Sequence, residues 1–148
     1  MSRENVDNRF EQPSGGSTDN KLVLGGSVET ATGANLKTKL VAVPIGDVSS
    51  AGSVFVAPGV AGTIVNFSNV IDAAITAADA GLTLEIGGVA VTGADITITQ
   101  SGSAAGDVDQ AVPSALNVIT ASEAIEIVKD GLSTTASNGV VTLEILPS

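Results

Sequence analysis

The chain has 148 residues, a length that fits one domain able to bury roughly 70% of the surface exposed by its unfolded form. Hydrophobic residues make up 43% and charged residues 15%, which excludes a chain that is disordered throughout. No apolar run approaches the ~18 residues of a membrane helix, and the net charge of −10 disfavours nucleic acid and anionic lipid as partners. We therefore expect a folded domain that binds neither a membrane nor nucleic acid.

Several chemically versatile residue types are missing from the sequence. It contains no His, Cys, Trp or Tyr, and three Phe are its only aromatic residues. Ser-His-Asp and Cys-His catalysis, His-based acid/base chemistry and zinc sites built from Cys or His are thereby excluded. Platforms of Trp or Tyr for sugars or bases are absent too, and we expect Phe55 and Phe67 to serve the core. The sequence therefore predicts a protein that is not an enzyme and needs no cofactor.

Charge is distributed unevenly along the chain. Residues 1–40 hold five cations and five anions, whereas residues 41–148 hold eleven carboxylates against the single cation Lys129. An acidic body repels nucleic acid and anionic membranes, because no basic stripe offsets its charge. The first part of the chain is thus a different kind of surface from the rest.

Residues 1–20 are interpreted as an N-terminal arm that precedes a single domain over 21–148. They show no apolar period and contain a Pro-Ser-Gly-Gly-Ser run. Such a stretch is typical of a disordered tail, or of an extended arm that a neighbouring subunit holds in place. It has no apolar signal region and no small-residue cleavage site, so we expect synthesis in the cytoplasm without export.

From Lys21 onward, short segments rich in Val, Ile, Thr and Leu are separated by Gly every 8–12 residues or so, which is typical of β-strands. Breaks are expected at Pro44, Gly52 and Pro58. The early strands are predicted at 36–43, 53–57 and 62–71.

Residues 68–80 allow two interpretations. A short helix would begin at Ser68 as its N-cap and end before Gly81, because apolar residues of the segment lie near one helical face. The β-branched residues on both sides of Ser68 favour instead the end of a strand, followed by a turn over 76–79.

The later strands show a clear alternation of apolar and polar residues. Gly87-Gly88 predicts a hairpin turn between two of them, and Asp130-Gly131 predicts another turn. Asn138-Gly139 is the strongest hairpin signal and opens the final strand. The last strand should direct Val141, Leu143 and Ile145 to one side and end at Pro147. The predicted strands of this part are 82–86, a strand from Val89 through Val91, a further strand over 96–99, then 125–128 and 140–146.

About eight short strands with regular turn spacing predict an all-β fold, an antiparallel β-sandwich or jelly roll, with the extended arm before it. Thr-Leu-Glu-Ile occurs at 83–86 and again at 142–145, which hints at two related halves.

Carboxylates supply the only candidate chemistry. Asp107 and Asp109 form an Asp-x-Asp pair that could offer two oxygens to Ca²⁺, although a solvated polar loop explains them as well. A carboxylate pair could also hydrolyse glycosides, but the lack of Trp and Tyr for sugar stacking argues against it. Four other Asp lie beside turns, where hydrogen bonds to their own backbone would explain them: Asp47, Asp72, Asp79 and Asp95.

The body also resembles head decoration (cement) proteins and head-fibre base domains of tailed bacteriophages. The resemblance covers about two thirds of the chain. The matching stretches are VPIGDVS at 43–49, APGVAGTI at 57–64, TAADA at 76–80 before a Leu-Thr-Leu-Glu-Ile strand, SGSAAGDVD at 101–109, PSALNVITASEAIEI at 113–127 and KDGLST at 129–134.

This resemblance implies a structural protein of the virion, located on the outside of the capsid, with the major capsid protein and further copies of itself as partners. A homo-oligomer is expected, with a trimer favoured. Binding would use the arm and one end of the body. The alternative is a glycan-binding or host-surface-binding β-sandwich module of a phage fibre, tail or adhesin. The arm residues expected to contact the capsid are Arg3, Arg9, Phe10 and Lys21.

Overall fold

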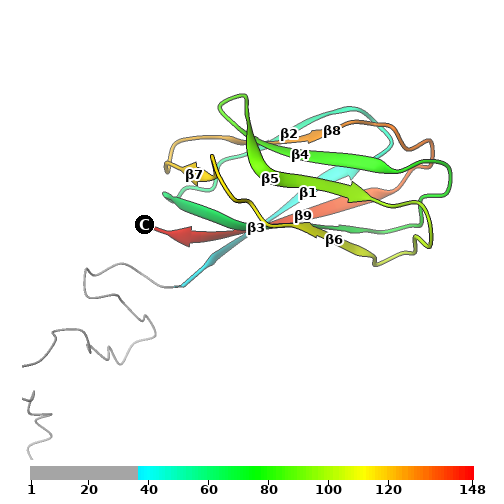
Figure 1. Ribbon diagram of the computed structural model, residues 1–148, viewed down its shortest axis with the longest axis horizontal. Coiled ribbons are helices and arrows are strands. Elements are labelled where there is room, and N and C mark those ends of the chain that lie inside the picture. Colours follow the sequence, from blue (N-terminus) through cyan, green and yellow to red (C-terminus); the bar gives the residue numbers. More distant parts are fainter. Residues whose placement is uncertain (1–36) are drawn as a thin grey trace, which may run out of the picture.

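The computed structural model describes residues 37–148, which form two antiparallel β-sheets packed face to face (Figure 1). No helix occurs in this range, and hence none that could span a membrane. The all-β prediction is confirmed, and the two-layer arrangement is that of a β-sandwich. The arm residues Arg3, Arg9, Phe10 and Lys21, and the predicted strand start at Leu36, lie outside the described residues.

The first sheet is centred on β9 and β3, the two strands of ten residues that pair with each other along their length. Its order is β1-β9-β3-β6, and the short β7 also pairs with β3. The strands are β1 (Lys39–Asp47), β3 (Gly62–Ile71), β6 (Val108–Ala111), β7 (Val118–Ile119) and β9 (Asn138–Pro147).

The second sheet has the order β2-β8-β4-β5, and all of its neighbouring strands are antiparallel. The turn predicted at Gly87-Gly88 joins β4 to β5, and both glycines have positive φ. The strands are β2 (Gly52–Val56), β4 (Ala80–Ile86), β5 (Val89–Ile98) and β8 (Ile125–Lys129).

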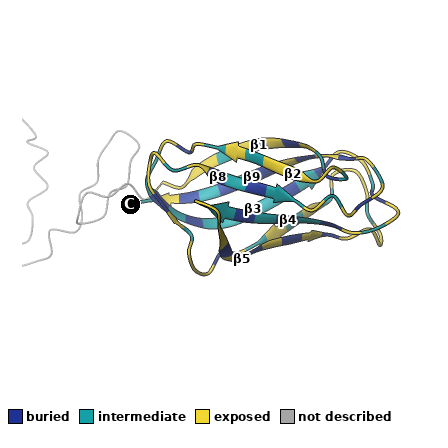
Figure 2. Cartoon of the chain, turned by 90° about the horizontal axis from the view of Figure 1, so that it is seen from above, coloured by how far each residue is buried: buried dark blue, intermediate teal, exposed yellow. Residues whose placement is uncertain are grey.

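Alternate side chains of each strand fill the space between the sheets, so that buried and exposed positions follow one another along the ribbons (Figure 2). In β9 the predicted inner residues Val141, Leu143 and Ile145 are completely buried. Burying each such side chain contributes roughly 1.5–3 kcal/mol. The intervening residues of β9 therefore form part of the outer surface.

Of the two Phe expected in the core, only Phe67 is buried, whereas Phe55 is 63% exposed. Strand alternation explains the difference, because Val54 and Val56 of β2 pack against the core and leave Phe55 on the opposite side. The prediction for Phe55 is wrong because the two valines of β2 occupy the positions that face the core.

The strand-and-turn interpretation of residues 68–80 is confirmed. Strand β3 continues to Ile71, because its last residues pair with the start of β9. The loop that follows is fixed by its own contacts: the Ile75 side chain is completely buried and its N–H donates to Ser103 Oγ at 3.1 Å.

Three predicted boundaries are wrong. Strand β1 does not break at Pro44 but runs on to Asp47, with a register shift after Pro44. It pairs with β9 alone, and an edge strand tolerates the missing N–H of proline. Asn138-Gly139 makes no hairpin turn; it opens β9 and pairs with β1, since the preceding strand β8 belongs to the other sheet.

The third boundary concerns β5, which was predicted as two strands. It is one strand with an irregularity at Gly93, whose φ of 76° favours glycine. Near this point Thr92 leaves β4 and pairs with a loop: its N–H donates to the Ala115 carbonyl at 3.0 Å, and its carbonyl accepts from Ser114 N at 2.8 Å.

The crossing from β8 to β9 begins at the predicted Asp130-Gly131 turn, where Asp130 Oδ1 accepts from Leu132 N at 3.0 Å. Gly131 has a φ of 68°, and a Cβ added to it would lie 2.8 Å from Ala51 Cα and closer still to Ala51 N. Glycine therefore meets two requirements at this position: it adopts the left-handed backbone conformation, and it leaves space for the backbone of Ala51, just before β2.

We expect Gly131→Ala to lower the free energy of unfolding by at least about 3 kcal/mol, because backbone strain and a backbone clash add together. Gly87→Ala is the matched control: its φ is 60° and an added Cβ meets nothing within 4 Å. It should cost only about 1 kcal/mol. Urea unfolding followed by circular dichroism measures both, since the chain lacks Trp and Tyr. Equal losses would contradict the assignment of a clash at Gly131.

Candidate functional site

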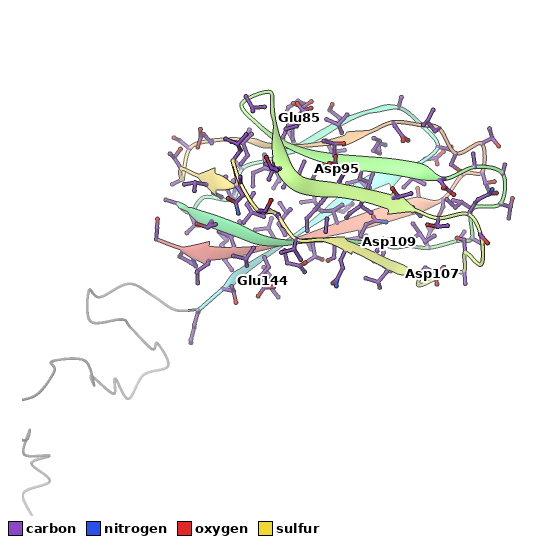
Figure 3. The ribbon with its side chains drawn as sticks, viewed as in Figure 1. Glu85, Asp95, Asp107, Asp109 and Glu144 are labelled. Atoms are coloured by element: carbon purple, nitrogen blue, oxygen red, sulfur yellow. The ribbon has the colours of Figure 1, made fainter. Side chains whose placement is uncertain are left out.

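The predicted carboxylate pair lies at the start of β6 (Figure 3). Asp107 closes its own loop, because its Oδ2 accepts from Ala104 N at 2.6 Å and its N–H donates to the Ala104 carbonyl at 3.2 Å. Asp109 lies within β6, in register with Asn69 of β3. Burial, and secondarily the charge of Asp107, raise the pKa of the Asp109 carboxyl.

These two carboxylates supply few ligands for a cation. Ca²⁺ takes six to eight oxygens, and no group of three or more Asp and Glu in residues 37–148 is arranged to hold a metal ion. One carboxylate of the pair is already used by its loop. A calcium role for Asp107 and Asp109 stays a prediction.

The other Asp expected to bond only their own turns mostly link distant segments. Asp47 combines a local and a distant contact, since its Oδ1 accepts from Ser49 N at 2.9 Å and from Ser137 N at 3.2 Å. Asp79 accepts from Gln100 N, and Asp95 accepts from the Thr83 hydroxyl across the β4–β5 pair. These aspartates therefore form hydrogen bonds between strands and loops that are distant in the sequence.

Asp72 accepts three hydrogen bonds and joins the loop after β3 to the start of β9. Its Oδ1 accepts from Asn138 N at 2.8 Å and from Ser137 Oγ at 3.1 Å, and its Oδ2 accepts from Asn138 Nδ2 at 2.9 Å. Hydrogen bonds from Asn138, and then from Ser137, lower the pKa of Asp72. Asn138 thus donates two hydrogen bonds to Asp72 at the point where β9 begins.

Lys129, the only cation after residue 40, crosses between the sheets. It lies at the end of β8, and its Nζ donates to the carbonyls of Ile45 at 2.8 Å and Asp47 at 2.9 Å, both in β1. A charged donor bound to two carbonyls stabilises this junction. The pKa of Asp47 is lowered by hydrogen bonds from Ser49 and also by the nearby positive charge of Lys129.

Asn69 is a buried amide on the inner side of β3 that has no hydrogen-bond partner among the described residues. It is 1% exposed, and both side-chain polar atoms are unpaired. A Cβ on Gly139 would lie 2.7 Å from Asn69 Oδ1, so glycine at 139 leaves room for the amide. A buried unpaired amide costs free energy relative to an apolar side chain of similar size.

The outer face of the second sheet is acidic. Cross-strand register places Glu126 of β8 directly beside Glu85 of β4, and Thr83 of β4 beside Asp95 of β5. The exposed Phe55 pairs with Glu126 on the other side. We call this surface the acidic face; its members are Ser53, Phe55, Thr83, Glu85, Ala90, Asp95, Thr97, Glu126 and Val128.

The outer face of the first sheet is almost uncharged. Glu144 is the single ionised side chain in its middle, and Asp47, paired with Asn138, lies at one end. Figure 3 shows Glu144 on the side of the molecule opposite to Glu85 and Asp95. We call this surface the apolar face; its members are Leu40, Ala42, Pro44, Thr63, Asn66, Ser68, Val70, Val108, Gln110, Val118, Val140, Thr142, Glu144 and Leu146.

Exposed large hydrophobic side chains concentrate on the apolar face. Among the ten in residues 37–148, half belong to it, and Val108 and Val118 are 64% and 69% exposed. Monomeric soluble proteins rarely leave a large contiguous apolar surface uncovered. The body is therefore two-sided, with three strand carboxylates on one face and half of the exposed large hydrophobic side chains on the other. The five are Leu40, Val108, Val118, Val140 and Leu146.

Comparisons with protein-family models, with curated proteins and with solved structures gave no match. The assignment of function therefore rests on the chain's own residues and on the contrast between its two faces.

We expect Asn69→Val to raise the free energy of unfolding by about 1–2 kcal/mol, because it removes an unpaired buried amide and keeps the volume similar. Asn66→Val, on the outer face of the same strand, is the control and should change stability by less than about 0.5 kcal/mol. Urea unfolding gives both values. A loss of stability in Asn69→Val would contradict this and would indicate a buried water bound to the amide.

Acid should weaken the junction around Asp72. Its folded pKa lies below its ordinary value of 3.8, so the ionised group stabilises the fold above about pH 4. That contribution is lost as the pH falls through the folded pKa. We expect Asp72→Asn to be less stable than the natural chain at neutral pH, and the difference to shrink in acid. Urea unfolding over a pH series measures it, and a difference independent of pH would contradict the role of the charge.

Proposed function

We propose that the chain is a structural, non-enzymatic protein of a bacteriophage virion, a decoration protein that binds the outer surface of the capsid and stabilises it. The observation that carries the proposal is the contrast between the two faces of the sandwich. One outer face holds Glu85, Asp95 and Glu126, while the other holds Glu144 in its middle, Asp47 at one end, and half of the exposed large hydrophobic side chains. A part attached to a larger assembly needs one side for protein contacts and one for solvent.

The N-terminal residues support the same role by their composition. Residues 1–20 include two Arg and one Phe in a stretch without an apolar period, and they are continuous with the edge strand β1 through residues 21–38. A segment that orders on binding gains contact area at an entropic cost, and many copies on one particle make the linkage firm. The resemblance to phage cement proteins, noted on the sequence, agrees with this arrangement.

The alternative, a glycan-binding or host-surface-binding module, is favoured by one observation. Phe55 is exposed beside Glu126 on the acidic face. An exposed aromatic ring next to a carboxylate can stack on a sugar while the carboxylate accepts hydrogen bonds from its hydroxyls. This candidate predicts that Phe55→Ala abolishes glycan binding, whereas the capsid proposal expects no glycan binding at all.

Capsid binding is tested with heads of the encoding phage prepared without this protein. We expect the natural chain to sediment with such heads and to raise their temperature of disruption. The triple variant Arg3→Glu/Arg9→Glu/Phe10→Ala should bind at least tenfold more weakly, because it removes both arginine charges and the only aromatic ring of residues 1–20.

The control is Glu85→Gln on the acidic face, which should bind heads like the natural chain. Unchanged binding of the triple variant would overturn the role of residues 1–20. Failure of the natural chain to bind heads at all would overturn the proposed function.

A further inference from the structure

We propose that the apolar face binds the same face of a second copy of this chain, with two-fold symmetry. This rests on the proposed function and assigns the apolar face to contact between copies, which leaves residues 1–20 and one end of the body for the capsid. It replaces the trimer expected from the resemblance with a two-fold pair. The following observations on register, charge and area carry it.

Side chains of similar character line up across the strands of the apolar face. Pairing of β1, β9, β3 and β6 brings one residue of each strand into an apolar row, and the next row contains small uncharged side chains. The apolar row is Pro44, Val140, Val70 and Val108; the next row is Ala42, Thr142, Ser68 and Gln110.

The end of the face nearer the C-terminus is apolar as well. There Leu146 of β9 pairs with Thr63 of β3, which pairs in turn with Val118 of β7. Between this end and the uncharged row lies the row of Leu40, Glu144 and Asn66. Glu144 therefore lies away from both apolar rows, whereas Asp47, paired with Asn138, borders the row of Pro44 and Val140.

Charge selects this face for contact between copies. Residues 37–148 hold eleven carboxylates and three Lys, one of which is Lys129 bound to carbonyls of β1. Two such bodies repel each other over most orientations. Contact through the apolar face brings Glu144 and, at one end of the face, Asp47 of each copy toward the interface. The acidic face would bring Glu85, Asp95 and Glu126 of each copy, so the apolar face is the approach with less repulsion.

A two-fold axis parallel to β9 and β3, and between them, makes the face complementary to itself. It exchanges the positions of these two strands, so that Glu144 of one copy lies opposite Asn66 of the other, whose amide can donate to the carboxylate. The apolar row meets the apolar row, and Thr142 meets Ser68. An axis across the strands would instead set β9 against β9, so that Glu144 would face either Glu144 or a different row of the other copy and would lack that partner.

The area of the face suffices for a weak dimer. Four strands about 4.8 Å apart and about eight residues long at about 3.4 Å per residue give roughly 500 Å² per copy. Two copies then bury roughly 1,000 Å², at the lower limit for a specific interface. We therefore expect association at roughly micromolar concentrations, reversible on dilution.

Sedimentation velocity of the full chain over a range of concentrations tests the proposal, with interference detection because Trp and Tyr are absent. The natural chain should shift from monomer to dimer as concentration rises. Val108→Lys should raise the dissociation constant at least tenfold, because the charge falls in the apolar row. Val89→Lys is the matched control: its side chain is 55% exposed on the β4–β5 hairpin, outside the face, and the dissociation constant should not change. Circular dichroism checks that each variant is folded.

The position of the axis has its own test. Because the chain has no Cys, Ser68→Cys and Thr142→Cys can be mixed and treated with a short thiol-reactive cross-linker. The mixture should give cross-linked dimers, and neither variant alone should do so to the same extent. Equal cross-linking of a single variant would overturn the axis.

A chain that stays monomeric at every concentration would overturn the proposal, as would equal effects of Val108→Lys and Val89→Lys. If the monomeric chain still binds heads and Val108→Lys weakens that binding, the apolar face belongs to the capsid contact. In that outcome the proposed function stands while the contact between copies fails.

Discussion

Strand β9 carries the constraint on which the rest of the sandwich depends. It is hydrogen-bonded on both sides, to β1 and to β3, over most of its ten residues. Because successive side chains point to opposite sides, a single register determines both what fills the core and what covers the first sheet. Val141, Leu143 and Ile145 lie in the core, and the residues between them supply the centre of the apolar face. A slip by one residue would exchange these two sets.

The alternating pattern of the sequence was enough to predict most strands. The range 62–71 of β3 matches the structure, and the inner residues of β9 follow from their period of two. Errors arose where tertiary pairing decided the outcome. Asn138-Gly139 has the composition of a hairpin turn, but its backbone extends because the neighbouring strand in the chain lies in the other sheet and Asp72 binds Asn138. Pro44 is accommodated because β1 lies at an edge.

The functional surfaces could be predicted only in part, since they depend on register between strands far apart in the chain. Glu85 and Glu126 become neighbours, and so do Val70 and Val140, only when the pairing of their strands is known. The sequence showed that the body is acidic and could not show that its outward-facing strand carboxylates fall mostly on one face. The sequence also could not show which side of β2 faces the core and therefore that Phe55 is exposed. Val54, Phe55 and Val56 are all apolar, so either orientation of the strand satisfies the alternating pattern.

Pro44 has a consequence for how copies of this chain can join. It lies in the outer strand of the first sheet, where a proline and the register shift beside it interrupt the row of backbone donors that another strand would need. Continuous growth of the sheet by adding strands from further molecules is therefore obstructed along β1. Association through the face of the sheet, in contrast, is complete once two copies have met, since each copy has one such face. Pro44 thus hinders open-ended extension of the sheet along this edge, whereas the proposed contact between apolar faces would close with two copies.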